Sequence, residues 1–419
     1  MMHASEFNTA QFCSRSRHVQ LEIYLADAKQ TNQPVLLTAA LSSLLYFRGR
    51  ELLMVYTNAP GRLPEINTFS HHEIKFADRV RSCEDVLVLE SRGVALLACD
   101  AGRERWNTVM GIFLPDPASA SLYVYDYKDA AAPDASALRR VEMVGFAGEA
   151  DFHTLGMAYD ERTSTLFAAN HAKAGPRIEL FSLDLDRLVA SHAGTIQHPL
   201  IHGPNSIALA GSRELYVSND HYFLARRSKL LARAETFLGL PLGTVVHLKL
   251  SADKPGDVDE ARVVARAAFA NGVEVLNSTA VAVASTTRSA VYLYERRRDG
   301  SLAYASSIPV PFLPDNLSLH GGKLIIAGHP HFPSLVKFTA SRHVCNDAAE
   351  LARADDAMRA YCEQATATSW VAEWSEAEGL KSLYAGTEYP TSATAARDSK
   401  RGVGIISGLY AKGILVWRD

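Results

Sequence analysis

Five residues with oxygen-bearing side chains stand near the start of strand-like segments that are far apart in the sequence. They are Glu84 in SCEDVLVL, Asn205 in HGPNSIAL, Asn271 in FANGVEV, and the pair Asp315 and Asn316 in LPDNLSL. Calcium takes about six to eight oxygen ligands in a flexible geometry, whereas zinc favours imidazole or thiolate. Two carboxylates and three amide carbonyls would neutralise a calcium ion and leave positions open. Asn and Asp are also common in turns before strands, so it is their recurrence at the same place in separate segments that indicates a metal site.

The segments that carry these residues belong to a repeated pattern of short strands. From about residue 84 onward, apolar strands rich in Val, Ile, Leu and Tyr alternate with Gly/Asp/Asn turns. Grouped as sheets, they form about six units, which begin near Glu84, Leu155, Asn205, Asn271, Asp315 and Ala393. This predicts an all-β, six-bladed β-propeller, although the irregular spacing also fits a large β-sandwich. In a propeller the first strand of each blade lines the central channel, so the oxygen-bearing side chains would meet at an axial calcium site.

Two inserted helices are expected to interrupt the strands. Residues 225–238 (ARRSKLLARAETFL) place Leu and Phe against Arg and Lys at helical spacing, which predicts an amphipathic helix. Such a helix can act as a lid, lie on a membrane or lipid surface, or pack on one face of the propeller. A second helix is expected over residues 346–364, and we assign it no chemistry.

Composition excludes some classes of partner. The chain has 419 residues, 47% of them apolar, and a formal net charge of -3 without a long basic block, which argues against nucleic acid. Its five cysteines show no CxxC spacing, so neither a zinc site nor a dense disulfide framework is predicted. Cys345 and Cys362 either form a local disulfide or remain free thiols beside a helix.

The N-terminal region suggests a secretory route. Residues 1–33 are polar and aperiodic, which predicts a disordered leader. Residues 34–47 (PVLLTAALSSLLYF) form an apolar run that is signal-like, a membrane anchor or a buried helix, and residues 34–61 complete this segment with a linker. The propeller is expected over residues 62–419. Asn277 begins an Asn-Ser-Thr glycosylation sequon, which is compatible with a secreted or membrane-anchored glycoprotein.

Several short motifs give the chain a family resemblance. The stretch His202 to Phe223 (HGPNSIALAGSRELYVSNDHYF), with CEDV at 83–86, FANG at 269–272, PDN at 314–316 and GHP at 328–330, resembles the serum paraoxonase/arylesterase family. The resemblance implies a six-bladed propeller with two axial calcium ions. It also implies a hydrolase of lactones, aryl esters and sometimes phosphotriesters, with residues 225–238 where the family has its active-site helix.

The resemblance also carries the family's calcium ligands onto this chain. The catalytic calcium would be held by the five residues named above, without a substitution. The second calcium would take Asp85 and the backbone carbonyl of Met157. Its third ligand, an aspartate in the family, is Ser206 here, so we expect weaker binding or an empty second site.

The family's histidines are only partly matched. The position of the first histidine, immediately before Gly156, is Leu155, and His153 lies two residues upstream. On a regular strand that offset moves a side chain by roughly 6 to 7 Å along the same face. His171 in AANHAK matches the second histidine, and His329 in GHPHF matches a histidine of the family's pocket. Each also has an ordinary structural role open to it, as a turn, buried or wall residue.

These residues suggest one catalytic mechanism and two alternative functions. Calcium would polarise the carbonyl or phosphoryl oxygen of a small lipophilic ester or lactone, and water would attack. His171 with or without His153, or a carboxylate such as Glu84 or Asp315, would remove the proton. No GxSxG motif supports a serine hydrolase. The competitors are a sugar lactonase of the related propeller group and a non-catalytic, calcium-holding module that binds lipid or protein.

Overall fold

The computed structural model describes residue 38, residue 42, residue 46, residues 48–129 and residues 132–419. The chain divides into two units, Met1–Leu52 and Leu53–Asp419. In the first unit, residues 48–52 are helical. The expected leader, residues 1–33, lies outside the described residues, as does most of the apolar run 34–47. Among the described residues, no helix has the length and apolar character needed to cross a membrane.

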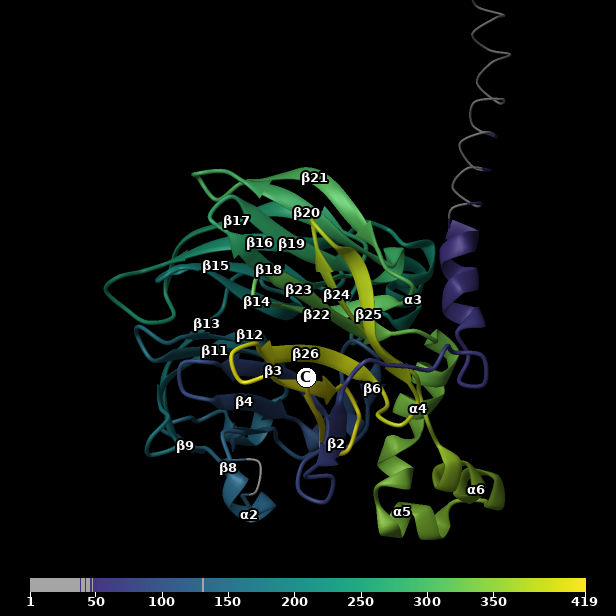
Figure 1. Ribbon diagram of the computed structural model, residues 1–419. Helices are drawn as coiled ribbons and strands as arrows, with labels where there is room; N and C mark the ends of the chain where they lie inside the picture. Colours follow the sequence, from purple (N-terminus) through teal and green to yellow (C-terminus); the bar gives the residue numbers. More distant parts are fainter. Residues whose placement is uncertain (1–37, 39–41, 43–45, 47, 130–131) are drawn as a thin grey trace, which may run out of the picture. The chain divides into compact units, whose positions relative to one another are not determined.

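The second unit is mostly β and contains six sheets of four or five strands (Figure 1). The first sheet contains β3 (Cys83–Leu89), β4 (Val94–Cys99), β7 (Ser121–Asp126) and β8 (Leu138–Arg140). The second contains β10 (Thr154–Asp160), β11 (Thr165–Ala172), β12 (Gly175–Asp184), β13 (Val189–Ile196) and β9 (Glu142–Val144). The third contains β14 (Pro204–Gly211), β15 (Glu214–Asn219), β16 (Gly243–Leu250) and β17 (Val258–Ala267).

The remaining sheets follow the same plan. The fourth contains β18 (Ala270–Asn277), β19 (Ala280–Ser285), β20 (Ala290–Arg296) and β21 (Leu302–Pro309). The fifth contains β22 (Leu313–His320), β23 (Lys323–His329), β24 (Ser369–Ser375), β25 (Gly379–Gly386) and β1 (Ile66–Asn67). The sixth contains β26 (Ser392–Asp398), β27 (Val403–Gly408), β28 (Ile414–Arg418) and β2 (His71–Lys75). A separate hairpin joins β5 (Trp106–Asn107) and β6 (Ile112–Phe113).

Burial explains which segments form which strands. All residues of β4 and β27 are buried, because neighbouring sheets cover both faces of these strands. The outer strand β21, in contrast, exposes four consecutive residues. These two second strands are therefore covered on both faces, whereas the outer strand β21 meets solvent.

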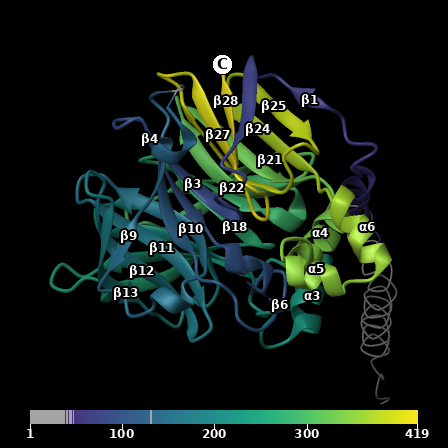
Figure 2. The ribbon, with the colours of Figure 1, turned by 90° about the horizontal axis from the view of Figure 1, so that it is seen from below.

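The first strands of the six sheets are neighbours in space (Figure 2). Strand β3 lies against β10, β10 against β14, β14 against β18, β18 against β22, β22 against β26, and β26 against β3. Each of the six predicted unit starts lies in the first strand of a different sheet. Two glycines allow the close approach, since a Cβ on Gly272 would lie 2.7 Å from the carbonyl oxygen of Asp315 and one on Gly156 would lie 2.6 Å from that of Asn205.

The helices differ from the expected ones. Helix α3 spans Lys229–Leu238 and not residues 225–238, because residues 225–227 form a turn and the Ser228 hydroxyl caps the helix by accepting the backbone N–H of Leu231. The single helix expected over residues 346–364 is two short helices, α5 (Ala348–Arg353) and α6 (Asp356–Gln364). They follow α4 (Phe332–Cys345), which the sequence interpretation missed. The described residues also include the helical segment 48–57 and the short helices α2 (Asp134–Ala137), η1 (Ala101–Glu104), η2 (Glu149–Asp151) and η3 (Thr286–Arg288).

Two disulfides are present in the described residues. Cys345 and Cys362 are bonded, which decides between the two alternatives left open by the sequence. Cys83 and Cys99 are also bonded, and this pair was not anticipated. The two cysteines are paired across β3 and β4, a proximity that only the register of the strands creates. Cys13 lies outside the described residues.

Candidate functional site

The predicted ligands Glu84 and Asn316 are joined directly. The Nδ2 atom of Asn316 donates a hydrogen bond to Oε1 of Glu84 at 2.8 Å and another to Oγ1 of Thr394 at 3.0 Å. The Thr394 hydroxyl in turn donates to the carbonyl oxygen of Glu84 at 2.9 Å. These bonds link the first strands of three sheets and hold the remaining oxygens of Glu84 and Asn316 in place.

Asn271 is oriented by a neighbouring threonine. Its Nδ2 atom donates to Oγ1 of Thr286 at 3.1 Å, and the Thr286 hydroxyl donates to the carbonyl oxygen of Pro314 at 2.7 Å. Because Pro314 directly precedes Asp315, this chain of bonds ties β18 to β22 beside the predicted ligands. Thr286 therefore sets which side of the Asn271 amide is available.

The side chains so oriented leave a set of buried oxygens without partners. Among the described residues, Oε2 of Glu84 and the Oδ1 atoms of Asn205, Asn271 and Asn316 are buried and accept no hydrogen bond. Buried polar atoms are nearly always paired, so four such oxygens on the predicted ligands call for a common explanation. A cation that prefers oxygen ligands fits this donor set.

The charges near Glu84 point the same way. Burial raises the pKa of the Glu84 carboxyl well above its usual range, and the charges of Asp85 and Asp315 raise it further. Arg103 and the hydrogen bond from Asn316 lower it in part. A buried carboxyl beside other carboxyls needs a proton or a cation to offset its charge.

The described residues contain no group of three or more His, Cys, Asp or Glu that is arranged to hold a metal ion. The predicted set does not depend on such a group, because three of its five members are asparagines. Amide oxygens are ordinary calcium ligands, whereas softer metals select imidazole or thiolate.

Asp85 and Ser206, at the predicted second calcium site, already accept hydrogen bonds from the protein. Oδ2 of Asp85 accepts the backbone N–H of Met157 at 2.7 Å, and Oδ1 accepts the backbone N–H of Val86 at 2.8 Å. The Ser206 hydroxyl accepts the backbone N–H of Val273 at 3.2 Å. Burial raises the pKa of Asp85 to about 6, while these hydrogen bonds oppose the rise. Protein partners therefore already occupy the oxygens of Asp85 and Ser206.

His329 lies against a predicted ligand. Its Nε2 atom is 2.9 Å from Oδ2 of Asp315, and both residues are buried. The contact places His329 beside the predicted ligand set. It also holds the Asp315 carboxylate in one orientation.

Both nitrogens of His171 are engaged by the protein. Its Nε2 atom donates to the carbonyl oxygen of Pro204 at 2.7 Å, so Nδ1 is the acceptor for the hydroxyl of Thr108. Burial is the main cause that lowers the pKa of His171, which favours this neutral form. Because Pro204 directly precedes Asn205, this hydrogen bond from His171 holds the strand that carries a predicted ligand in position.

His153 is closer to His171 than a regular strand would place it. It lies before β10, whose register with β11 is interrupted between Thr154 and Met157, and its carbonyl oxygen accepts the backbone N–H of His171 at 2.8 Å. Both imidazoles line one cavity of about 10 Å³ together with Leu155. The Nδ1 atom of His153 is 3.4 Å from Oδ2 of Asp100, and its buried Nε2 atom has no hydrogen-bond partner.

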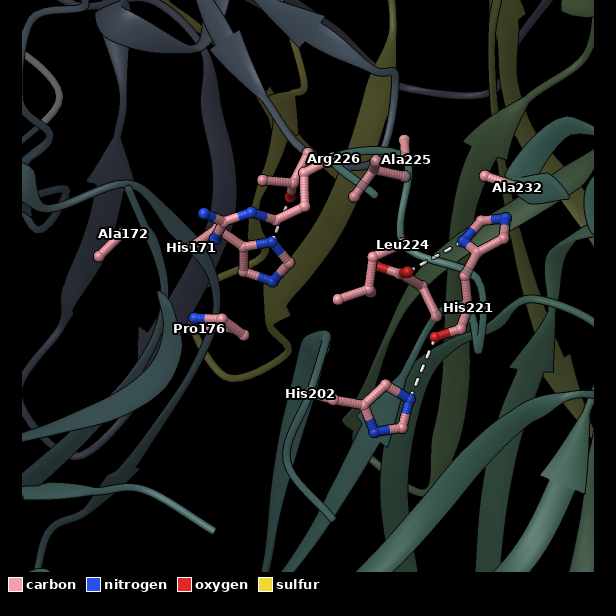
Figure 3. Close-up of a pocket in the computed structure, with 12 residues that line it drawn as sticks. His171, Ala172, Pro176, His202, His221, Leu224, Ala225, Arg226 and Ala232 are labelled. Atoms are coloured by element: carbon pink, nitrogen blue, oxygen red, sulfur yellow. Dashed lines mark hydrogen bonds and ion pairs between the residues drawn. The ribbon is translucent and has the colours of Figure 1, made fainter. Parts of the chain in front are cut away.

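A second cavity opens on the other side of His171 (Figure 3). In Figure 3, His171 and His221 lie on opposite sides of it, with Leu224 between them. The Nδ1 atom of His221 donates to Oδ1 of Asp220 at 2.9 Å, and its Nε2 atom donates to Oγ1 of Thr236 at 2.7 Å. Burial lowers the pKa of His221, but the hydrogen bond and charge of Asp220 outweigh it and raise the pKa overall. His221 is thus suited to carry a positive charge.

The loop beside this cavity is held by helix α3. The Glu235 side chain is buried and accepts the backbone N–H groups of Tyr222 at 3.0 Å and Phe223 at 2.9 Å. Sequence reasoning missed this role, and it also missed Thr286, Thr394 and Asp100. No local pattern marks these residues, since each acts on a segment distant in the sequence.

The predicted glycosylation residue is accessible. Asn277 ends β18 and is exposed, and its Oδ1 atom accepts the backbone N–H of Thr279 at 2.8 Å. Modification at Asn277 stays a prediction.

Comparison with known proteins finds relatives among the serum paraoxonases. Serum paraoxonase/arylesterase 1 of Homo sapiens is 30% identical over 176 residues, which cover 41% of this chain and 46% of that protein. Serum paraoxonase/lactonase 3 of Oryctolagus cuniculus is 26% identical over 311 residues, which cover 73% of this chain and 82% of that protein. The alignment with the human protein thus spans less than half of that relative.

A solved structure supports the fold. A gluconolactonase of Xanthomonas campestris has a TM-score of 0.50 and 14% identity, covering 85% of this chain and 94% of that one. This likeness shows a mostly β, propeller-like fold and nothing about activity. A family model described as Arylesterase matches residues 112–361, more than half of the chain. The resemblance carried by the sequence motifs is therefore confirmed, and the chain belongs to the arylesterase family.

Proposed function

We propose that the protein is a calcium-dependent hydrolase of lipophilic lactones and aryl esters, with phosphotriesters as secondary substrates. The observation that carries the proposal is the set of four buried, unpartnered oxygens on Glu84, Asn205, Asn271 and Asn316. Family membership supports an esterase or lactonase. The two catalogued relatives named above are called an arylesterase and a lactonase.

The fold we propose is a closed, six-bladed propeller. The order of contacts between the first strands supports closure, because β26 lies against β3. The sixth sheet also pairs β2, from the N-terminal side of the unit, with the C-terminal strand β28. Pairing β2 with β28 ties the first part of the unit to its last strand, which supports a closed arrangement of the sheets.

The calcium ion would be held by Glu84, Asn205, Asn271, Asp315 and Asn316. When bound, it supplies Lewis-acid polarisation of the substrate's carbonyl or phosphoryl oxygen. A second ion is not proposed, because the oxygens of Asp85 and Ser206 already accept hydrogen bonds from the protein.

The proton of the attacking water would pass to Nε2 of His153. That atom is buried and has no hydrogen-bond partner, although Oδ1 of Asp151 lies 3.7 Å away. Asp100 lies beside the other ring nitrogen, as in dyads where a carboxylate orients an imidazole base. The cavity of about 10 Å³ between His153 and His171 has about the volume that one water needs. His171, with both nitrogens engaged, instead positions Asn205 through Pro204.

The substrate would lie against apolar side chains. Leu224 lines the cavity in Figure 3, and a neighbouring cavity is lined by Phe237, Phe269 and Phe332. Aromatic and aliphatic walls favour lipophilic acyl or aryl groups over sugars. This argues against a sugar lactonase.

A lipid surface is a further proposed partner. Helix α3 exposes Leu230 and Leu238, at 78% and 59%, next to the basic residues Arg226 and Arg227. An exposed apolar surface flanked by cations suits an interface with lipid. A secretory location and an anchoring role of residues 34–47 belong to the same proposal.

Hydrolysis assays test the function directly. Phenyl acetate, a medium-chain lactone and gluconolactone are incubated with the full chain in calcium, after chelation, and after calcium is restored. We expect turnover of the first two that chelation abolishes and calcium restores. Absence of chelator-sensitive turnover would favour the non-catalytic module, and preference for gluconolactone would favour the sugar lactonase.

A further inference from the structure

A large apolar cavity lies between helices α3 and α4, which Figures 1 and 2 place on the same side of the sheets. Its volume is about 310 Å³. Phe237 of α3 and Phe332 of α4 line it and pack edge to face, with ring centroids 5.5 Å apart. Val336 and Met110 also line the cavity. The cavity is therefore formed by two helices that lie outside the strands of the sheets.

This cavity leads toward the candidate site. Phe269 lines it, packs at a tilt against the His221 ring at a centroid distance of 4.4 Å, and stands two residues before Asn271. His221 and Ala232 line both this cavity and the smaller one beside His171. A substrate whose reacting carbonyl lies at the ligand set would extend its chain into this space.

Two cations interrupt the apolar wall. Lys229 and Arg233 are four residues apart on α3 and both line the cavity, with the Lys229 ammonium 5.4 Å from the centre of the Phe113 ring. Within the part of the chain that the structure describes, neither forms an ion pair with an Asp or Glu. The only acidic residue of α3 is Glu235, whose carboxylate is engaged by backbone N–H groups.

The cations belong to the cavity face of the helix. Positions 229, 232, 233, 236 and 237 all line the cavity and recur at the spacing of one helical face. The exposed leucines, Leu230 and Leu238, do not line it. Lys229 and Arg233 are therefore placed to meet a ligand inside the cavity rather than a surface that rests on the leucines.

We infer that the cavity selects substrates with a lipophilic chain that ends in an anionic group, such as a carboxylate, at the end remote from the hydrolysed carbonyl. The inference rests on the proposed function and specifies its substrate class. The apolar walls remove the chain from water, while the solvent-exposed ammonium of Lys229 and guanidinium of Arg233 attract its anionic end. A substrate with a neutral chain would be stabilised only by contact with the apolar walls.

Matched esters test the selection. We compare 4-nitrophenyl hexanoate with the mono-4-nitrophenyl ester of adipic acid, which has the same chain length and a terminal carboxylate. The Lys229→Gln/Arg233→Gln variant should lower kcat/KM for the anionic ester about five- to tenfold, the effect of losing one or two charge-assisted contacts. It should change kcat/KM for the neutral ester less than about twofold. The Arg298→Gln variant removes an exposed cation that lies outside the cavity and outside helix α3, and is the control.

Binding without turnover separates this inference from the proposed function. Calorimetry measures octanoate and octanamide binding to the wild-type chain and to both variants. Tighter binding of octanoate that only Lys229→Gln/Arg233→Gln abolishes supports the inference even if no ester is hydrolysed. The inference is overturned if octanoate and octanamide bind equally well, or if the double variant loses kcat/KM equally for both esters. The inference is also overturned if the double variant keeps the ester selectivity of the wild type but no longer binds phosphatidylglycerol vesicles. That result would assign the two cations to a membrane surface.

Discussion

The buried carboxylate of Glu235 accepts the backbone N–H of Tyr222 at 3.0 Å, so the helix that walls the cavity also fixes the loop that carries His221. The same carboxylate holds Phe223. Asp220 and His221 stand immediately before these residues, between the cavity and the candidate site. The position of the loop thus depends on a helix that begins several residues later.

Replacement of Glu235 should release this loop. In Glu235→Gln the amide keeps one acceptor oxygen but turns a donor toward one of the two backbone N–H groups, which should cost about 1 to 3 kcal/mol. Hydrogen exchange at Tyr222 and Phe223 should speed up, and denaturant unfolding should show the lower stability. Glu363→Gln, on the exposed face of α6, is the control. Unchanged exchange at the two amides would contradict the positioning role.

Removal of an unpartnered oxygen should weaken calcium binding. Asn271→Ala deletes one such buried atom, and we expect calcium affinity to fall more than the roughly 10- to 100-fold typical of changes beside a ligand. Hydrolysis should be lost in parallel. Asn277→Ala changes the exposed end of the same strand and should leave both unchanged. Calcium titration by calorimetry checks this, and equal affinities in the two variants would remove Asn271 from the site.

The two histidines should respond differently to substitution. His153→Gln removes the proposed base and should lower kcat about 100-fold while calcium affinity is kept. In His171→Gln the amide can still donate to the carbonyl oxygen of Pro204. Its kcat should stay within about fivefold of wild type, because only the loss of a base is expected to lower kcat about 100-fold or more. His171→Leu cannot donate and should weaken calcium binding. A 100-fold loss of kcat in both His171 variants would make His171 the base instead.

Stability should depend on the charge of His221. The pKa of His221 is raised by Asp220, with Glu235 adding to the effect, so the protonated ring stabilises the folded chain. This contribution is fully present below the ordinary histidine pKa of about 6.5 and is lost as pH rises through the higher folded value. Unfolding free energies of wild type and His221→Gln should therefore converge as pH rises from 6 to 9. A constant difference across that range would show that the ring does not titrate there.

Much of the scaffold was predictable because its signals are local. Each of the six strand-start predictions lies in the first strand of a different sheet, since alternation of apolar segments with turn residues is written in consecutive positions. Helix α3 was recognised from its spacing, but its start was placed four residues early because the turn before Ser228 has the same basic composition as the helix. Helix α4 was missed because its aromatic, polar and basic residues show little periodicity.

By itself the sequence determined the family, the starts of the six sheets and the oxygen-bearing residues proposed to bind calcium. Tertiary structure alone decided how those residues are used. Thr286 and Thr394 orient Asn271 and Asn316, and the strand register bonds Cys83 to Cys99. The carbonyl oxygen of Pro204 fixes the proton of His171 on Nε2, and the Thr108 hydroxyl occupies Nδ1, the nitrogen that a base would need. The physical reason is that residue type sets which hydrogen bonds and ligands are possible, whereas distance and direction between separate strands choose among them.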